Sequence, residues 1–419
     1  MSGPYRVLLV SDAFAPMIGG ADRAVGSVGV ELAARGHTVA VATAWQPGLP
    51  ARETRDGIPV HRLRDLTSRV PFISADPYRH VPPPFPDPEG VIRFRRLIRR
   101  FDPDLVHSYG WITYSCATAL AGTGVPLVLS MHDYGNFCAL RTLLHMDRDP
   151  CTGAAPAKCL RCSASHYGAV KGAVAAAGVL GGRTLLTRRA RAVQSNSEYT
   201  RSVTWRDLLA GRARFVQGSA VDTVIPPFGG HIPEGEPDRT LLARLPDRYI
   251  LFVGALRRVK GIRQLIEAHS RLADPPPLVI VGTHEIDTPS SFPAGVTVIE
   301  AMPHATVMAA WERALFGVFP SVGPEPFGMV VNEAMSRGRA VIGTTPGGHG
   351  EMIVDGETGL LVPGGDVEAL AAAMRRLIDD ESLRERLGAA GARRASLFEP
   401  ETWVPRVEAL YDAALGAAA

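Results

Sequence analysis

Short apolar runs, each followed by a glycine-containing loop and a helical pattern, recur along this sequence and strongly restrict its fold. Residues 5–11 have the pattern of a buried strand, two glycines follow at 19–20, residues 21–34 form a helical pattern, and 38–43 form the next strand. A strand–loop–helix–strand order predicts a parallel sheet with right-handed crossovers. The sequence therefore predicts an α/β protein.

The strand series continues in two blocks. The first block adds residues 104–107 and 125–130, and the second block comprises 249–254, 278–282, 296–300, 317–320 and 340–343. A chain of 419 residues fits two domains of about 200 residues each. We expect two Rossmann-like, doubly wound domains facing a central cleft, with ligands at the carboxyl ends of the strands.

The domain boundaries follow from the same pattern. An acceptor-side domain is expected over residues 1–228, with an insertion at about 134–165, and a donor domain over 240–397. The polar stretch between them has the composition of a linker. Residues 398–419 are expected to form a C-terminal helix that packs back toward the first domain.

One segment of the first block is rich in proline. Residues 71–90 contain the run Pro82–Pro88 and are expected to form an exposed loop, because proline cannot continue a regular element. Residues 91–100 then have the apolar spacing of an amphipathic helix. We expect that helix to flank the sheet; the alternative is a helix that lies on a membrane surface.

Charge and hydropathy restrict location and partners. No stretch reaches the roughly 18 apolar residues of a membrane span, and the N-terminal run is interpreted as a strand, not a signal peptide, so a cytoplasmic protein is expected. Residues 1–225 contain 27 Lys and Arg against 17 Asp and Glu, whereas the remainder contains 18 against 25. The excess of basic residues in the first half favours an anionic acceptor or peripheral association with the inner membrane face. Two domains whose solvated surfaces differ in charge explain this excess equally well. No nucleic-acid partner is expected.

The segment EPFGMVVNEAMSRG, from Glu325 to Gly338, carries the strongest functional signal. It follows a predicted strand, so it is expected to be a loop that enters a helix. The N–H groups at a helix N-terminus bind phosphate without a side-chain cation. The residues expected to supply them are Phe327, Gly328, Met329 and Val330. Glu325 and Glu333 are carboxylates suited to accept hydrogen bonds from sugar and ribose hydroxyls; the alternative is an ordinary capped helix.

A second signal lies in residues 254–261, again where a strand enters a helix. Lys260 is one of only three lysines among the 45 basic residues, and a compact positive charge suits a pyrophosphate leaving group. A surface lysine in a turn is the alternative.

These motifs, with the segment Pro16–Gly20, resemble the retaining glycosyltransferases of family 4, and the similarity runs from Tyr5 to about Trp403. The resemblance implies a GT-B fold whose C-terminal domain holds most of a nucleoside-diphosphate sugar donor. It implies that Glu325 contacts donor sugar hydroxyls, that Glu333 contacts the ribose and that Lys260 contacts the diphosphate. Gly19 and Gly20 are expected to bring backbone to the same phosphates, and His132 to hydrogen-bond the transferred sugar near the reacting centre.

One position departs from the family pattern. The family usually has an arginine where this chain has Ala255, and Arg257 or Arg258 is the candidate to replace it. The resemblance implies transfer with retention, without a protein nucleophile or a catalytic metal, to an unidentified acceptor such as a specialised metabolite, polysaccharide or lipid. The alternatives are a nucleotide-sugar 2-epimerase of the same fold and a non-catalytic nucleotide-sugar binding protein.

Four of the five cysteines cluster just after His132, and the last two have the Cys-x2-Cys spacing common in chelating sites. They are Cys138, Cys151, Cys159 and Cys162. A cytoplasmic protein should not keep them as disulfides. The sequence predicts a structural zinc site or, less favoured, an iron–sulfur cluster; four reduced thiols in a flexible loop are the alternative.

Overall fold

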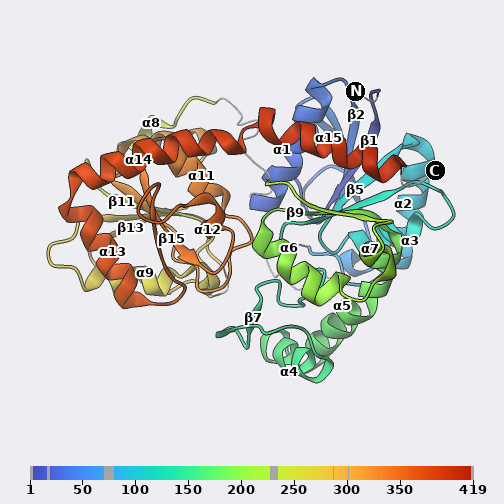
Figure 1. Cartoon of the computed structure of the whole chain (residues 1–419), viewed down its shortest axis with the longest axis horizontal. Coiled ribbons are helices and arrows are strands. Elements are labelled where there is room, and N and C mark those ends of the chain that lie inside the picture. Colours follow the sequence, from blue (N-terminus) through green and yellow to red (C-terminus); the bar gives the residue numbers. More distant parts are fainter. Residues whose placement is uncertain are drawn as a thin grey trace. The chain divides into compact units, whose positions relative to one another are not determined.

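The computed structural model describes residues 3–16, 19–69, 80–226, 235–285, 287–300 and 302–416. The chain divides into two compact units. Unit 1 comprises residues 1–231 together with 400–419, and unit 2 comprises 232–399. Each unit has a central parallel sheet covered by helices (Figure 1). The prediction of two doubly wound α/β domains is thereby confirmed, whereas most of the predicted linker, residues 227–234, lies outside the described part.

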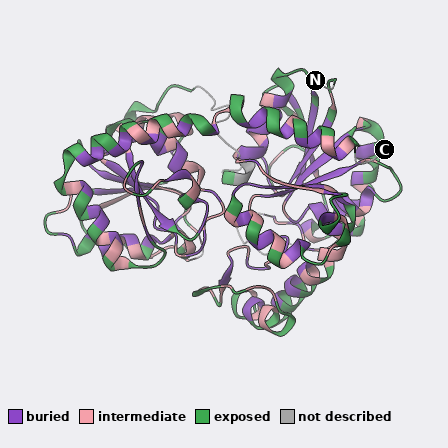
Figure 2. Cartoon of the chain, in the orientation of Figure 1, coloured by how far each residue is buried: buried purple, intermediate pink, exposed green. Residues whose placement is uncertain are grey.

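The sheet of unit 1 has the order β10-β9-β6-β5-β1-β2-β4-β3, in which β3 and β4 pair antiparallel. Its strands are β1 (Arg6–Ser11), β2 (Thr38–Ala44), β3 (Arg52–Arg55), β4 (Ile58–Leu63), β5 (Leu105–Tyr109), β6 (Leu127–Met131), β9 (Ala190–Ser195) and β10 (Val221–Val224). Because successive strand residues point to opposite faces, Leu8 and Val10 join one hydrophobic cluster and Val7 and Leu9 join the other. The central strands are buried in both units, whereas the edge strands β3 and β10 are partly exposed (Figure 2).

Helices of unit 1 cover both faces of this sheet. They are α1 (Gly20–Ala34), α2 (Pro88–Phe101), α3 (Thr113–Ala119), α4 (Pro156–Tyr167), α5 (Ala169–Arg189), α6 (Glu198–Thr204), α7 (Ala213–Val216) and α15 (Pro400–Gly416), with a π-helical turn at Trp205–Leu209 and a short hairpin of β7 (Leu144–His145) and β8 (Asp149–Pro150). The C-terminal helix α15 packs beside α1 (Figure 1). Its buried Trp403 and Leu410 join the cluster of Val7 and Leu9, and the Tyr411 hydroxyl lies 2.8 Å from Nδ1 of His107.

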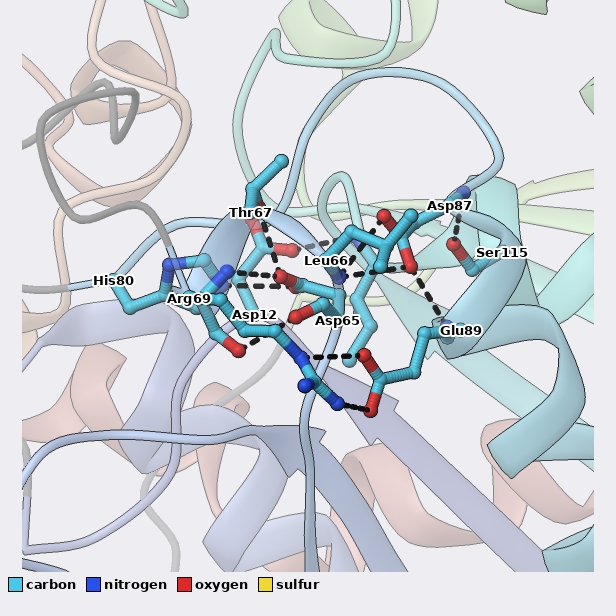
Figure 3. A network of polar contacts seen from close by, with 12 residues as sticks. Asp12, Asp65, Leu66, Thr67, Arg69, His80, Asp87, Glu89 and Ser115 are labelled. Carbon is cyan, nitrogen blue, oxygen red and sulfur yellow. Dashed lines mark hydrogen bonds and ion pairs between the residues drawn. The ribbon is translucent and has the colours of Figure 1, made fainter.

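The proline-rich loop differs from its prediction. Residues 70–79 lie outside the described part, but residues 80–87 are mostly buried or half-buried, and α2 begins at Pro88. Side chains pair the polar groups of this segment (Figure 3): Nε2 of His80 lies 2.8 Å from a carboxylate oxygen of Asp65, and the Asp87 N–H donates to Oγ of Ser115 at 2.9 Å. Prolines lack an N–H, and the polar groups of His80 and Asp87 have partners, so the loop can be buried.

One helix of unit 1 corrects the expectation that no stretch of the chain is apolar enough to span a membrane. In the described part of the chain, α5 is long and apolar enough to cross a membrane by length and composition. A single helix of this kind is weak evidence for a span. The helix packs on α4 at a close crossing. At that crossing a Cβ on Gly172 would lie 2.5 Å from the backbone of Ala164.

The sheet of unit 2 has the order β13-β12-β11-β14-β15-β16 and is parallel throughout. Its strands are β11 (Ile250–Val253), β12 (Leu278–Val281), β13 (Val296–Ile299), β14 (Phe316–Val318), β15 (Ala340–Thr345) and β16 (Leu360–Pro363). Its helices are α8 (Arg239–Leu242), α9 (Ile262–Ser270), α10 (His304–Arg313), α11 (Met329–Ser336), α12 (His349–Met352), α13 (Val367–Asp379) and α14 (Glu381–Ala395), with 3-10 turns at Arg258–Lys260 and Ser396–Phe398. This is the Rossmann strand order. From β11 the chain adds strands on one side, to β13, and then on the other side, from β14 to β16, so the strand order reverses between β11 and β14.

Candidate functional site

The reversal point of the unit 2 sheet brings the two main sequence signals together. The loop after β11 carries Lys260 and the loop after the neighbouring strand β14 carries Glu325. Nζ of Lys260 donates to both carboxylate oxygens of Glu325, at 2.8 and 2.7 Å, and Oγ of Ser321 donates to the same carboxylate at 3.0 Å. Open α/β sheets bind their ligands at such a point, so this pair marks the candidate site of unit 2.

Gly261 explains why the two loops meet. Its φ is +77°, and a Cβ at this position would lie 1.8 Å from the carbonyl oxygen of Pro320. Only glycine fits such an approach at a positive φ. The Lys-Gly pair therefore combines a charged group with the residue that lets its loop lie against the end of β14.

The turn from Glu325 to Gly328 leads into α11, as the sequence predicted. The Gly348 N–H donates to the carbonyl of Glu325 at 2.7 Å and fixes the start of the turn. Gly328 caps α11 with a φ of 100°, and a Cβ there would lie 2.5 Å from Nε2 of His349. The N–H groups of Met329 and Val330 belong to the first turn of α11, where a helix offers no internal acceptor. The Phe327 side chain is buried against Phe398, at 5.5 Å between ring centroids, so it anchors the turn.

The charge of Glu325 is set by opposing effects. Burial acts to raise the pKa of Glu325, but the positive charge of Lys260, the proximity of His349 and the hydrogen bonds from Lys260 and Ser321 outweigh it, so the pKa lies below its ordinary value. Glu325 is therefore ionised at neutral pH. An ionised carboxylate accepts hydrogen bonds and donates none, which suits contact with hydroxyl groups.

His349 belongs to this site, although its sequence pattern gave it no role. Its ring is buried, and Nδ1 accepts a hydrogen bond from the Thr344 N–H at 3.2 Å. Burial lowers the pKa of His349 to about 4, with Lys260 lowering it further and Glu325 opposing. The ring is therefore neutral at pH 7, and because Nδ1 accepts, Nε2 carries the proton on the side of Gly328. The ring supports the turn that enters α11.

Two further predicted residues lie in the same unit. Glu333, on α11, is largely buried and lies 3.0 Å from Nε2 of His304 at the start of α10. The guanidinium of Arg257, just before the Lys260 turn, makes no ion pair or hydrogen bond with any residue described. The Arg258 N–H donates to Asp287 at 2.9 Å. His304 was missed by the sequence analysis, because only the tertiary fold brings it to Glu333.

In unit 1, His132 follows β6 at the carboxyl edge of its sheet. Its Nε2 is buried and has no hydrogen-bond partner within the described ranges. Burial lowers the pKa of His132 to about 4, and Asp133 opposes this. The edge-on ring of Tyr109, with centroids 4.7 Å apart, holds the imidazole. His132 is thus neutral at pH 7 and held in position.

A charged cluster next to His132 was not predicted. Arg141 pairs with Asp133 at 2.6 Å and with Asp12, the residue after β1, at 3.0 Å. Asp12 also accepts from the Ile112 N–H at 2.7 Å. The predicted Gly19 caps α1 at the same edge of the sheet, and Gly20 is the first residue of that helix. The carboxyl ends of β1, β5 and β6 therefore converge in unit 1.

The four predicted cysteine ligands line a single cavity of about 30 Å³ in unit 1. All of them are free thiols. Within the part of the chain that the structure describes, no three His, Cys, Asp or Glu side chains are grouped closely enough to hold one metal ion. The thiols therefore surround a space without converging on one point.

Comparison with known proteins identifies the family. Residues 236–394 match the family described as "Glycosyl transferases group 1", and residues 19–216 match the "Glycosyl transferase 4-like domain". Glycogen synthase of Mycobacterium tuberculosis is 26% identical over 98% of this chain and 95% of that protein. A D-inositol 3-phosphate glycosyltransferase of Xylanimonas cellulosilytica is 32% identical over 43% of this chain and 45% of that protein.

Solved structures confirm the fold class. Sucrose-phosphate synthase from Thermosynechococcus elongatus superposes with a TM-score of 0.74 at 22% identity, covering 98% of this chain and 99% of that one. Anabaena HepE in complex with UDP-glucose gives a TM-score of 0.67 at 17% identity, covering 96% and 98%. At these identities the likeness concerns the fold alone, which is GT-B. Since the two matched segments together span most of the sequence, the chain belongs to the group 1, family 4-like glycosyltransferases.

Proposed function

We propose that this glycosyltransferase moves a sugar from a nucleoside-diphosphate donor to an acceptor hydroxyl and retains the anomeric configuration. The observation that carries the proposal is the Lys260–Glu325 pair at the reversal point of the unit 2 sheet, next to the N-terminus of α11. This combination offers a cation and backbone donors for a diphosphate, and a carboxylate for sugar hydroxyls.

The donor is assigned to the groups of unit 2. The N–H groups at Gly328, Met329 and Val330 and the ammonium of Lys260 bind the diphosphate, whose negative charge grows as the glycosidic bond breaks. Glu325 accepts hydrogen bonds from the donor sugar, and Glu333 from the ribose. Because Lys260 and Glu325 bond each other directly, donor binding replaces part of that pair with contacts to the ligand.

The chemical step needs no protein nucleophile in this proposal. The acceptor oxygen bonds to the anomeric carbon on the face that the diphosphate leaves, the electron pair of the broken bond goes to the diphosphate, and one of its oxygens takes the acceptor proton. Catalysis then consists of positioning and charge stabilisation. In unit 1, Nε2 of His132 is assigned to a hydroxyl of the transferred sugar, and the backbone at Gly19 and Gly20 to the phosphates.

The relatives support the donor class and leave the acceptor broad. One solved neighbour is described as a complex with UDP-glucose, and the curated relatives include a glycogen synthase, a D-inositol 3-phosphate glycosyltransferase and an α-maltose-1-phosphate synthase. These names indicate three different acceptors. We therefore propose an acceptor hydroxyl on a polysaccharide, a lipid or a specialised metabolite.

A donor screen followed by product analysis tests the proposal. The purified protein is expected to show a raised melting temperature with one class among UDP-, GDP-, ADP- and dTDP-sugars. Incubation with that donor should release nucleoside diphosphate and sugar, and NMR should show the donor's anomeric configuration in the first product. A nucleotide sugar epimerised at C2 would establish the epimerase instead. Stabilisation without any turnover, including with candidate acceptors, would establish a binding protein.

A further inference from the structure

Exposed apolar side chains gather in one part of unit 1. Among the residues that the structure describes, eight large apolar side chains are exposed, and half of them are Met146, Leu160, Val170 and Val174. These four, called the apolar patch from here on, belong to α4, to α5 and to the loop of the β7–β8 hairpin. The two helices pack side by side (Figure 1), and Oγ of Ser165 on α4 donates to Sδ of Met146 at 3.5 Å. Exposed apolar side chains that gather in this way mark an interaction surface.

The first half of α5 has its apolar side chains on the outside. Val170 and Val174 lie one helical turn apart and are 78% and 48% exposed. Only 28% of the residues in the most apolar 18-residue stretch of α5 are buried. The second half of the helix contacts α3, and its Leu186 is fully buried in the core of unit 1. A folded unit 1 therefore keeps α5 from crossing a membrane but leaves its first half open to a surface.

The charge of this part of the chain has one sign. Residues 150–197 contain seven Lys and Arg and neither Asp nor Glu. Arg161 and Lys171 are exposed, and they directly follow Leu160 and Val170 of the apolar patch. Positive charges therefore border the exposed aliphatic side chains, and an anionic partner complements them.

The composition of α4 and α5 favours a lipid surface over a protein partner. A second copy of this chain would bring the basic residues of two such helix pairs together, which is unfavourable. Protein interfaces are enriched in aromatic residues and depleted in lysine. Tyr167 is the one Phe, Tyr or Trp of the two helices, and it is half-buried with its hydroxyl bonded to the Ala139 carbonyl at 3.0 Å. Anionic headgroups attract Lys and Arg, and aliphatic side chains enter the boundary with the acyl chains.

We propose that the apolar patch and the adjoining basic residues of α4 and α5 dock unit 1 onto an anionic lipid surface. The aliphatic side chains enter the boundary between headgroups and acyl chains, while Arg161 and Lys171 stay among the headgroups. The two helices lie on the membrane and do not cross it. The acidic residues of the neighbouring hairpin do not cancel this charge, since Asp147 lies 2.8 Å from Nδ1 of His166.

The basic helix α2, the membrane candidate of the sequence analysis, fits this role less well. Its Phe94, Leu97 and Ile98 are buried in the core of unit 1. The large apolar side chain that it exposes is that of Ile92, which is 50% exposed. The helix α2 therefore offers charge with little apolar area, and Ile92 provides a matched control for the residues of the apolar patch.

Sedimentation of the full-length chain with lipid vesicles tests the proposal. The wild type is expected to sediment with vesicles of phosphatidylcholine mixed with phosphatidylglycerol but not with phosphatidylcholine alone, and salt should weaken the binding. Val170→Asp combined with Val174→Asp should lower the partition coefficient about tenfold, and Lys171→Gln about fivefold. Ile92→Asp should bind as the wild type does. Thermal melting should show that all variants fold, since the changed side chains are exposed.

Two measurements on the wild type complete the test. The mixed vesicles should slow amide hydrogen exchange in residues 169–177 and leave unit 2 unchanged. The proposal is overturned if the wild type does not bind the mixed vesicles, if the double variant binds them equally well, or if Ile92→Asp weakens binding as much as the double variant does. A wild-type dimer in sedimentation velocity that the double variant dissociates would assign the apolar patch to a second copy instead. None of these results depends on whether the protein transfers sugar.

Discussion

At the scale of single residues, Lys260 and Glu325 depend on each other. Lys260 holds the carboxylate ionised, and the carboxylate orients the ammonium through two hydrogen bonds. The pair places one positive and one negative group where a diphosphate and a sugar need them. The Lys260 side chain is about one-third exposed, whereas that of Glu325 is largely buried, so removal of Lys260 leaves a buried carboxylate without its cation.

Removing the Lys260 charge should lower turnover strongly. We expect Lys260→Met, which keeps most of the side-chain length, to lower kcat/KM about 10²- to 10³-fold, because one preorganised group that stabilises the leaving charge is lost. Far-UV circular dichroism should be unchanged. Glu267→Ala is the matched control, since it removes an exposed carboxylate of α9 that pairs with Arg271. Wild-type turnover in Lys260→Met would remove Lys260 from the mechanism.

Buried His349 should make stability depend on pH. Its pKa is about 4 in the folded protein and near 6.5 when unfolded. Between these values the unfolded chain binds the proton and the folded chain does not. The contribution of His349 to the free energy of unfolding is therefore complete above pH 6.5 and is lost as the pH falls toward 4. The loss amounts to about 3 kcal/mol. Glu325, whose pKa is lowered, adds its own loss only at more acidic pH.

The His349 prediction is checked by urea unfolding from pH 7 to pH 4. His349→Asn keeps an acceptor for the Thr344 N–H but cannot titrate. As the pH falls from 7 to 4, the free energy of unfolding should therefore decrease less in the variant than in the wild type. His107 and His132 also have lowered pKa values, but both proteins contain them and their effects cancel in the comparison. Parallel stability curves for the two proteins would contradict the assigned role of His349.

At the scale of elements, the turn that enters α11 depends on a glycine. We expect Gly328→Ala to raise the Kd for the donor at least tenfold, since the residue has a positive φ and a Cβ would meet the ring of His349 at 2.5 Å. Gly350→Ala, one residue beyond His349, meets nothing within 4 Å and serves as the control. Equal donor affinity in the two variants would show that this turn does not bind the donor.

The local parts of the fold and of the site could be predicted from the sequence. Continuous apolar runs predicted strands such as β1 and β12, and the loop-to-helix signal before α11 was correct, because these depend on neighbouring residues. The strand β9 was not predicted, since its sequence ARAVQS contains three polar residues and no continuous apolar run. Asp12, His304 and His349 were missed for another reason: residues distant in sequence give them their partners.

The loop before α2 shows the same limitation. Its prolines correctly excluded a helix or strand in residues 80–87, whereas α2 already begins at Pro88. They wrongly suggested exposure. The groups that allow its burial, Asp65 and Ser115, lie 15 residues before His80 and 28 residues after Asp87. Local composition carries no information about such partners, so exposure is harder to predict than the absence of regular structure.

At the scale of the whole molecule, the chain returns to unit 1 after completing unit 2. The helix α15 buries Trp403, Val404, Val407, Leu410 and Tyr411 in the unit 1 core. Each of these side chains contributes about 1.5–3 kcal/mol on burial, and together they approach the roughly 5–15 kcal/mol that stabilises a whole domain. The folding of unit 1 therefore requires the last segment of the chain.

In a chain that ends at Glu399, unit 1 should fail to fold while unit 2 stays folded. Hydrogen exchange is expected to show lost protection in β1 and β5, whereas β11 and β14 of unit 2 stay protected. Tyr411→Phe is the mild control, because it removes only the hydroxyl that contacts His107 and should cost about 1 kcal/mol. Full protection of β1 in the truncated chain would show that α15 is dispensable.

The donor site of unit 2 is tested most directly by calorimetric titration of sugar nucleotides into four proteins: wild type, Lys260→Met, Gly328→Ala and Glu267→Ala. The proposed donor site predicts that the wild type and Glu267→Ala bind one class of sugar nucleotide with equal Kd, and that the other two variants bind it at least tenfold more weakly. Equal affinity in all four proteins, or no binding of any sugar nucleotide by the wild type, would contradict it.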